Sequence, residues 1–174
     1  MKSKIYIDIQ AKAIWYLERY ATSSTNLKKY LKRKVQNTYM SLGSEEIIES
    51  IIIELEEQKI LNDKFFAEGR LKTLTNKGWS LKKSEYKLKE LGISQTIIKN
   101  CIDELGSDKQ ELDLIAAVKL TKKRSIGVFR RSELDDKIKN REYGIMARAG
   151  FSYDICKKLL TEMTKEEVEE IYDW

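Results

Sequence analysis

The sequence predicts an all-α fold: three tandem three-helix repeats that form an elongated, curved molecule. The 174 residues include no proline, and five of the eight glycines stand where helices are expected to end, namely Gly43, Gly78, Gly92, Gly106 and Gly150. Apolar residues recur at helical spacing along the chain, whereas the alternation typical of a strand is confined to residues 5–9. We expect residues 5–9 to form a tail or the lead into the first helix.

The repeat is clearest in three segments, residues 44–55, 94–105 and 152–163, each of which begins with a serine. In all three, apolar residues follow the serine by 3, 4, 7, 8 and 11 positions, a spacing that forms a single stripe on a helix. The segments lie 50 and 58 residues apart, which leaves room for two more helices in each repeat. A three-helix module of this size has a thin core, so we expect neighbouring modules to share apolar faces.

The expected helices follow from this division. They are residues 9–20, 26–35 and 45–59 in the first repeat (1–60, with an N-terminal tail), 63–76, 81–91 and 95–105 in the second (61–106), and 108–123, 133–149 and 153–163 in the third (107–174, with an acidic C-terminal tail). Residues that favour helix starts precede these and one further amphipathic stretch: Ser44, Asn62, Ser80, Ser94, Ser107, Ser132, Ser152 and Thr164. Capping-box spacing occurs from Ser107 to Gln110 and from Thr164 to Glu167.

The composition excludes many catalytic and metal sites. The chain has no histidine, which removes the commonest general base and every zinc site that needs imidazole, and its two cysteines are too few for an all-thiolate zinc site. No phosphate-binding glycine loop or nucleophile-elbow motif occurs. Cys101 and Cys156 occupy apolar positions of the repeated stripe, which favours core packing over a redox or metal role. We expect a non-enzymatic protein without cofactor or metal.

No targeting or membrane-spanning segment is predicted. The first eight residues lack an apolar stretch of signal-peptide length. The most apolar window, residues 47–55, contains Glu49 and Glu54 and is far shorter than the roughly 20 apolar residues that a span requires. The two cysteines lie in apolar periodic segments and do not suggest a disulfide framework, so we expect a reducing compartment, the cytoplasm. We also expect a monomer.

Charge alternates in sign along the chain. The formal net charge is +5 overall, but it is +7 for residues 1–43, −6 for 44–63, +5 for 64–92, −3 for 93–118, +6 for 119–150 and −4 for 151–174. The middle helix of each repeat is therefore basic and the third acidic. In a tandem stack this pattern predicts a basic stripe opposite an acidic side, a distribution typical of proteins that bind polyanions.

The basic helices supply the candidate binding residues. Cations interleave with an aromatic residue in each, as in proteins that track phosphates and stack bases of single strands. The candidates are Lys28, Lys29, Lys32, Arg33, Lys82, Lys83, Lys87, Arg130, Arg131, Arg141 and Arg148. Lysine-rich helix faces also occur merely for solubility, and Tyr30, Tyr86 and Tyr143 are expected to be packing residues because their registers differ between repeats. The clustered glutamates of residues 45–57 are expected on a solvated helix face.

Three motifs stand out along the chain. They consist of Leu61, Asp63, Phe66 and Ala67; of Lys77, Gly78, Leu88, Gly92 and Ile93; and of Arg148, Gly150, Phe151, Ser152, Tyr153 and Ile155. By these motifs, residues 11–163 resemble the RecX family of bacterial RecA regulators. Ser84 stands where an aliphatic residue is usual. In the first repeat Asn26 replaces a glutamate and residues 36–43 lengthen the following loop. Most of the matched apolar residues are expected in the core, and Asp63 is expected at a helix start.

The resemblance implies a function. It implies binding in the groove of the RecA filament on single-stranded DNA, with suppression of ATP hydrolysis, strand exchange and LexA coprotease activity. The expected partners are the RecA filament and single-stranded DNA, with double-stranded DNA as a further candidate. Two alternatives stay open: a helical module that binds DNA directly, without RecA, and an interaction scaffold whose basic face is incidental.

Overall fold

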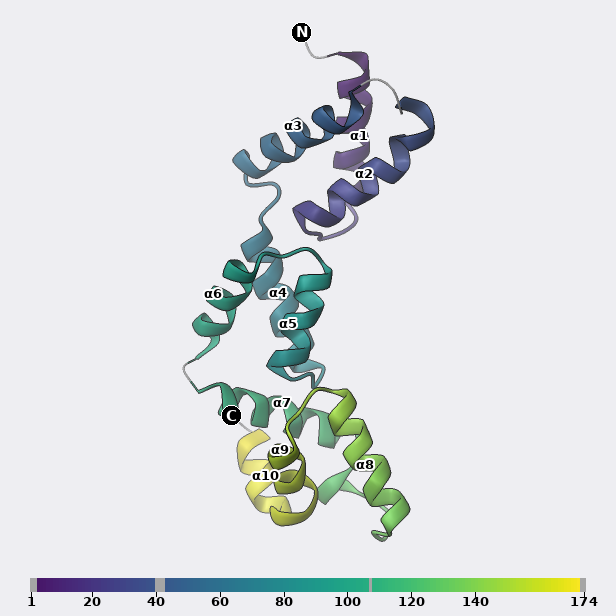
Figure 1. Cartoon of the computed structure of the whole chain (residues 1–174). Helices are drawn as coiled ribbons and strands as arrows, with labels where there is room; N and C mark the ends of the chain where they lie inside the picture. Colours follow the sequence, from purple (N-terminus) through teal and green to yellow (C-terminus); the bar gives the residue numbers. More distant parts are fainter. Residues whose placement is uncertain (1–2, 40–42, 107, 173–174) are drawn as a thin grey trace. The chain divides into compact units, whose positions relative to one another are not determined.

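The all-α class is confirmed in a computed structural model that describes residues 3–39, 43–106 and 108–172. The described residues form ten α-helices and two short helical turns, and no strand occurs among them. The elements are α1 (Lys4–Leu17), α2 (Ser24–Tyr39), α3 (Ser44–Glu57), α4 (Asp63–Asn76), α5 (Leu81–Glu90), α6 (Gln95–Leu105), α7 (Lys109–Arg124), η1 (Gly127–Phe129), α8 (Asp136–Arg148), α9 (Tyr153–Lys157), η2 (Lys158–Glu162) and α10 (Lys165–Tyr172) (Figure 1).

The chain divides into two compact units. Unit 1 contains residues 1–68 and 88–98, and unit 2 contains residues 69–87 and 99–174. The boundary thus passes through α4, α5 and α6. The division into three repeats, with bounds at 60 and 106, stays a prediction.

Most helices begin where the sequence predicts a cap. The side chains of Ser23, Asn62, Ser80, Ser94 and Ser152 each accept a hydrogen bond from the backbone N–H three residues later. The predicted capping box at the start of α10 is confirmed, because Glu167 and Thr164 each accept a hydrogen bond from the other's backbone N–H. These local bonds satisfy N–H groups that the first helical turn leaves without partners.

Several boundaries differ from the predicted ones. Ser44 is the first residue of α3 and not its cap, because Gly43 occupies the cap position. The first helix already begins at Lys4, so residues 5–9 are helical and not a tail. Helix α2 runs to Tyr39, so residues 36–39 continue a helix where a loop was expected. Helix α8 begins three residues later than expected because Asp135, and not Ser132, caps it by accepting from the N–H of Ile138. Asp108 caps α7; the predicted cap at residue 107 lies outside the described residues.

Unit 1 has its core between α1, α2 and α3, which pack against one another (Figure 1). Fully buried aliphatic side chains from all three helices meet there, including Ile9, Leu27, Leu31, Ile48 and Ile51. Burying each such side chain is worth roughly 1.5 to 3 kcal/mol in transfer free energy. The core therefore holds the basic helix α2 and the acidic helix α3 side by side.

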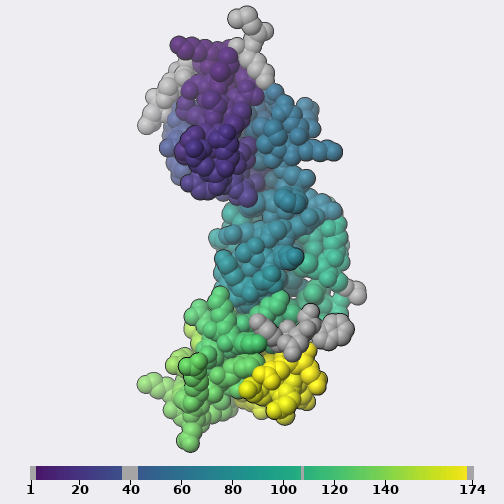
Figure 2. Space-filling model, turned by 180° about the vertical axis from the view of Figure 1, so that it is seen from behind, coloured from purple at the N-terminus to yellow at the C-terminus, as the bar shows by residue number. Residues whose placement is uncertain are grey.

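Unit 2 has a second core to which α7, α8, α9 and α10 contribute. Its buried residues include Ala117, Met146, Phe151, Leu159 and Val168. Val168 belongs to α10, a helix that packs against α7 and appears in yellow in Figure 2. The segment expected to be an acidic tail is thus a helix of the core, because one apolar residue among its glutamates is fully buried.

The repeated apolar stripe is buried in all three segments. Three of its five positions are buried each time: Ile48, Ile98 and Cys156; Ile51, Cys101 and Leu159; Ile52, Ile102 and Leu160. The last position varies, since Leu55 is buried, Met163 is half-buried and Leu105 is exposed. In the third segment the helix widens into the π-helical turn η2, which still keeps Leu159 and Leu160 buried.

Both cysteines are core residues, as predicted, and each is about 2% exposed. Burial raises the pKa of the Cys156 thiol, which leaves less of the reactive thiolate at neutral pH. We predict that Cys101→Ala lowers the free energy of unfolding by roughly 1 to 2 kcal/mol, because a small cavity replaces the sulfur. Urea unfolding followed by circular dichroism measures this change; an unaltered midpoint would contradict core packing at this position.

The same kind of junction occurs once in each unit. In unit 1 the Ser23 hydroxyl donates to the carbonyl of Leu91, and the Asp63 carboxylate accepts from the N–H of Ser24, the first residue of α2, at 2.8 Å. Asp63 thus serves a helix start, but that of α2 and not of its own helix. In unit 2 the N–H of Ser80 donates to the carbonyl of Ala149 (3.0 Å), and the Asp113 carboxylate accepts from the N–H of Leu81 (2.7 Å).

Candidate nucleic-acid interface

The cations of α2 divide into two groups. Lys28 and Lys32 form ion pairs with Glu49 and Glu45 of α3; the Lys32–Glu45 distance is 2.7 Å. The hydrogen bond from Lys32 lowers the pKa of Glu45, so that the carboxylate stays ionised. The basic side of α2 and the acidic side of α3 therefore meet in unit 1, whereas the sequence pattern predicted them on opposite sides.

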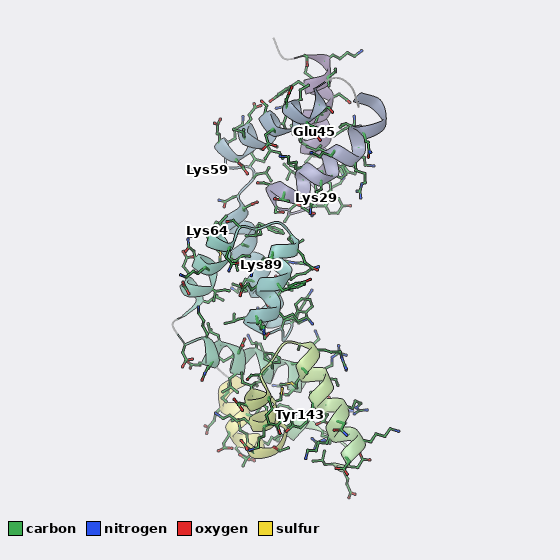
Figure 3. All side chains as sticks on the ribbon, in the orientation of Figure 1. Lys29, Glu45, Lys59, Lys64, Lys89 and Tyr143 are labelled. Atoms are coloured by element: carbon green, nitrogen blue, oxygen red, sulfur yellow. The ribbon has the colours of Figure 1, made fainter. Side chains whose placement is uncertain are left out.

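Three cations of α2 are exposed, namely Lys29, Arg33 and Lys34. Lys29 and Arg33 take part in none of the ion pairs that the described residues form. Figure 3 labels Lys29 on α2 and Glu45 on α3. Tyr30 stacks on Tyr16 with 4.2 Å between ring centroids, which confirms its predicted packing role.

Helix α5 presents its three candidate lysines differently. Lys82 is exposed, and Lys87 is half-buried. The Lys83 ammonium donates to the carbonyl of Arg148 at 2.6 Å and lies 4.1 Å from the ring centroid of Trp79. Tyr86 is 65% exposed, so its predicted packing role is wrong, and a basic helix here carries an exposed aromatic ring.

Arg130 has a partner inside unit 2. Its guanidinium donates two hydrogen bonds to the Glu142 carboxylate, from Nε at 2.8 Å and from Nη2 at 2.5 Å. The backbone N–H of Gly127 donates to the same carboxylate at 3.2 Å. Glu142 is 1% exposed, and hydrogen bonding to it raises the pKa of Arg130. This clamp fastens η1 to α8 and gives Arg130 a structural task.

The remaining candidates belong to unit 2. Arg131 and Arg141 are exposed. Tyr143 is half-buried beside the unit 2 core and stacks on Tyr153 with 5.7 Å between centroids, which confirms its packing role (Figure 3). Arg148, the last residue of α8, lines a pocket together with Lys83.

This pocket, called the basic pocket below, collects five cations. It has a volume of about 350 Å³ and is lined by Lys77, Trp79, Lys83, Leu120, Lys123, Arg124, Ile145, Arg148 and Ala149. No carboxylate is among these described lining residues. Cations so close together repel one another unless an anion lies between them, so the arrangement favours an anionic ligand.

A hollow in unit 1 is less suited to an anion. It is lined by Lys32, Arg33, Val35, Gln36, Ser44, Glu45 and Ile48 and has a volume of about 490 Å³. Its lining includes a carboxylate, Glu45, which already pairs with Lys32. Among the described residues no cluster of three metal-ligating side chains occurs, and no helix there is long and apolar enough to span a bilayer.

The candidates from the sequence lacked three of the five cations of the basic pocket and its tryptophan. Lys83 and Arg148 were candidates, but Lys77, Trp79, Lys123 and Arg124 were not. Lys123 and Arg124 end α7, where cations are favoured by the helix dipole, so their pattern alone indicated only a helix end. Lys77 and Gly78 both match a motif of the RecX family, but that match did not make Lys77 a binding candidate. The sequence contained two signals, the basic run of residues 122–124 and the Lys-Gly-Trp sequence of residues 77–79. Nothing in the sequence indicated that these two segments lie side by side.

Comparisons with known proteins test the resemblance. No protein-family model matches the chain. Two proteins named "Regulatory protein RecX" are similar to it: one from Agrobacterium fabrum is 28% identical over 162 residues (91% of this chain, 84% of the relative), and one from Myxococcus xanthus is 27% identical over 154 residues (85% and 81%). The crystal structure of RecX from Lactobacillus salivarius matches 97% of both chains with a TM-score of 0.66 at 21% identity, which shows a shared fold.

The resemblance to the RecX family is confirmed. It extends over most of the chain and over most of each RecX protein compared, so it includes both units and not one shared segment. The RecX motif residues have the core positions that the sequence predicted, since Ala67, Leu88, Ile93 and Phe151 are buried, although Phe66 is only half-buried.

Proposed function

We propose that this chain regulates the RecA recombinase by binding the RecA filament on single-stranded DNA. The observation that carries the proposal is its similarity, over 85 to 91% of its length, to proteins named as RecX regulators. The proposed activity is inhibitory: it suppresses ATP hydrolysis, strand exchange and LexA coprotease activity. The chain acts as a cytoplasmic monomer and without catalysis.

The charge of the molecule supports a partner that contains nucleic acid. The filament offers phosphates and acidic protein surface, and cations that are not engaged within the protein are the ones available to meet them. The exposed cations among our candidates are Lys29 and Arg33 on α2, Lys82 on α5, and Arg131, Arg141 and Arg148 in unit 2. Arg130 is left out of this set because Glu142 holds its guanidinium.

We predict that the triple variant Lys29→Glu, Arg33→Glu and Lys82→Glu inhibits RecA at least tenfold less well. Each reversal replaces an attraction to the filament by a repulsion, and loss of each phosphate contact flattens the salt dependence of binding by about 0.7 to 0.9 in log–log slope. The fold should persist, because exposed lysine, arginine and glutamate have similar helix propensities. The measurement is RecA ATPase on single-stranded DNA, titrated with each variant at several salt concentrations.

The matched control reverses Lys72, Lys99 and Lys158, three exposed cations outside the candidate set. It changes net charge by the same amount, so a similar loss of inhibition in both variants would mean that only the total charge matters. Absence of any effect of the unaltered protein on RecA would refute the proposed function itself. Equal affinity for bare DNA and for the RecA filament would favour the alternative, a module that binds DNA directly without RecA. The basic pocket is the observation that supports this alternative.

A further inference from the structure

The basic pocket differs from the other cations of the surface because packing fixes the backbone segments that form its walls. Gly78 lies so close to α7 that an added Cβ atom would be 2.7 Å from the Cβ of Leu120, which sets the turn carrying Lys77 and Trp79 directly on that helix. The bond from the N–H of Ser80 to the carbonyl of Ala149 joins the same turn to the end of α8. The pocket cations thus project from three segments that the packing of unit 2 holds together.

Two further bonds orient the pocket. The Lys83 ammonium is held by the Arg148 carbonyl and lies over the Trp79 ring, so this cation lines one wall in a defined place. The Lys119 ammonium donates to Asn76 at 2.7 Å, which fastens α7 to the end of α4 just before Lys77. Because Lys83 and the backbone segments of the pocket are already held in place, binding has less of the site to order, which favours affinity.

The lining combines two kinds of surface. Guanidinium and ammonium groups from Arg124, Arg148 and Lys77 suit the oxygens of a phosphate. Trp79, Leu120 and Ile145 supply aromatic and aliphatic surface of the kind that contacts a base. An acidic peptide would use the cations but leave this apolar wall without a partner, and the volume suits one small ligand unit better than an extended segment.

We propose that the basic pocket binds one nucleotide of a single DNA strand, with its phosphate among Lys77, Arg124 and Arg148 and its base against Trp79. The inference rests on the proposed function for its setting, in which the strand is the one that RecA coats. Binding by the pocket is nevertheless a property of this chain and is measured without RecA.

The test uses the full chain and a fluorescent oligodeoxythymidylate of 20 nucleotides, with binding followed by anisotropy at several salt concentrations. The pocket variant combines Lys77→Gln, Arg124→Gln and Arg148→Gln, and the matched control combines Lys72→Gln, Lys99→Gln and Lys158→Gln. We expect the pocket variant to bind about tenfold or more weakly and to lose roughly 0.7 unit of log–log salt slope, because the three cations meet one phosphate and each single-strand phosphate contact contributes about 0.7. The control should change much less.

A second variant separates stacking from charge. Trp79→Leu keeps an apolar side chain in the wall and removes the ring, and we expect binding to weaken by roughly 5- to 150-fold, the cost of losing one base stack, with an unchanged salt slope. Thermal unfolding of every variant shows whether unit 2 is intact. Trp79→Leu binding as tightly as the wild type would overturn the assignment of the base to this wall.

The outcomes distinguish the pocket from the proposed function. Equal weakening by the pocket and control triples would show that general surface charge binds the strand, which overturns the inference. Loss of RecA binding in the pocket variant, with oligonucleotide binding intact, would assign the pocket to an acidic protein surface and also overturns it. A third outcome is that the wild type binds the oligonucleotide through the pocket but does not change the RecA ATPase. That outcome would support nucleotide binding by the pocket and refute the proposed function.

Discussion

Arg130→Ala is expected to lower the free energy of unfolding by about 3 to 5 kcal/mol, the range found when one partner of a buried ion pair is removed. The reason is the Glu142 carboxylate, which is 1% exposed and receives two of its hydrogen bonds from Arg130. Without the guanidinium, only the N–H of Gly127 would face this charge. Guanidinium chloride unfolding at pH 7 measures the loss.

Two companion variants identify the cause. Arg131→Ala removes the neighbouring exposed arginine and should change stability by less than about 0.5 kcal/mol. The double change Arg130→Met with Glu142→Leu removes both charges and should recover most of the stability, because two apolar side chains replace a costly buried pair. If Arg130→Ala unfolds like the wild type but binds DNA less well, Arg130 is a contact residue and the clamp has little energetic weight.

Gly150→Ala is expected to cost about 3 kcal/mol. Gly150 has φ +92°, a backbone conformation that strains a residue with a Cβ atom by roughly 1 to 3 kcal/mol. The new Cβ would also lie 2.9 Å from the Cβ of Lys83 and closer still to the Ser80 hydroxyl. Relief of that clash would separate α5 from the end of α8 and loosen the junction between Ser80 and Ala149.

The matched substitution is Gly69→Ala. Gly69 lies within α4, and an added Cβ there would meet no atom within 4 Å. Alanine should therefore stabilise the protein by roughly 0.5 to 1 kcal/mol through helix propensity. Thermal unfolding of the two variants should move in opposite directions. A Gly150→Ala protein as stable as the wild type would mean that the junction adapts at little cost.

Local features of the chain were predicted well because their causes are local. Helices α4 and α6 have the bounds expected from their caps and apolar spacing, and three of the five stripe positions are buried in every segment. A cap acts over three residues and a stripe over about three turns, so both are legible in a short stretch of sequence. Where they failed, a competing cap such as Asp135 replaced the expected Ser132.

The α10 helix was half predicted. Its capping box was recognised from Thr164 and Glu167, but its glutamates were read as a solvated tail. One fully buried residue, Val168, attaches the helix to the unit 2 core. Ile171, three residues later, is partly buried against the same core. Two apolar residues in one short helix give a much shorter apolar pattern than the five positions of the repeated stripe.

The site depended on contacts that charge patterns do not encode. The alternation of basic and acidic helices was real, but it did not reveal that Lys28 and Lys32 neutralise α3 or that Arg130 clamps Glu142. Lys83 and Arg148 are 65 residues apart in the chain and meet only because the packing of unit 2 brings the ends of α8 and α5 together. From the sequence alone it follows that the chain carries basic helices. Which cations pair with a carboxylate of the same protein and which line a pocket was settled only by the tertiary fold, because the possible partners of each cation are distant in sequence and are brought together by packing.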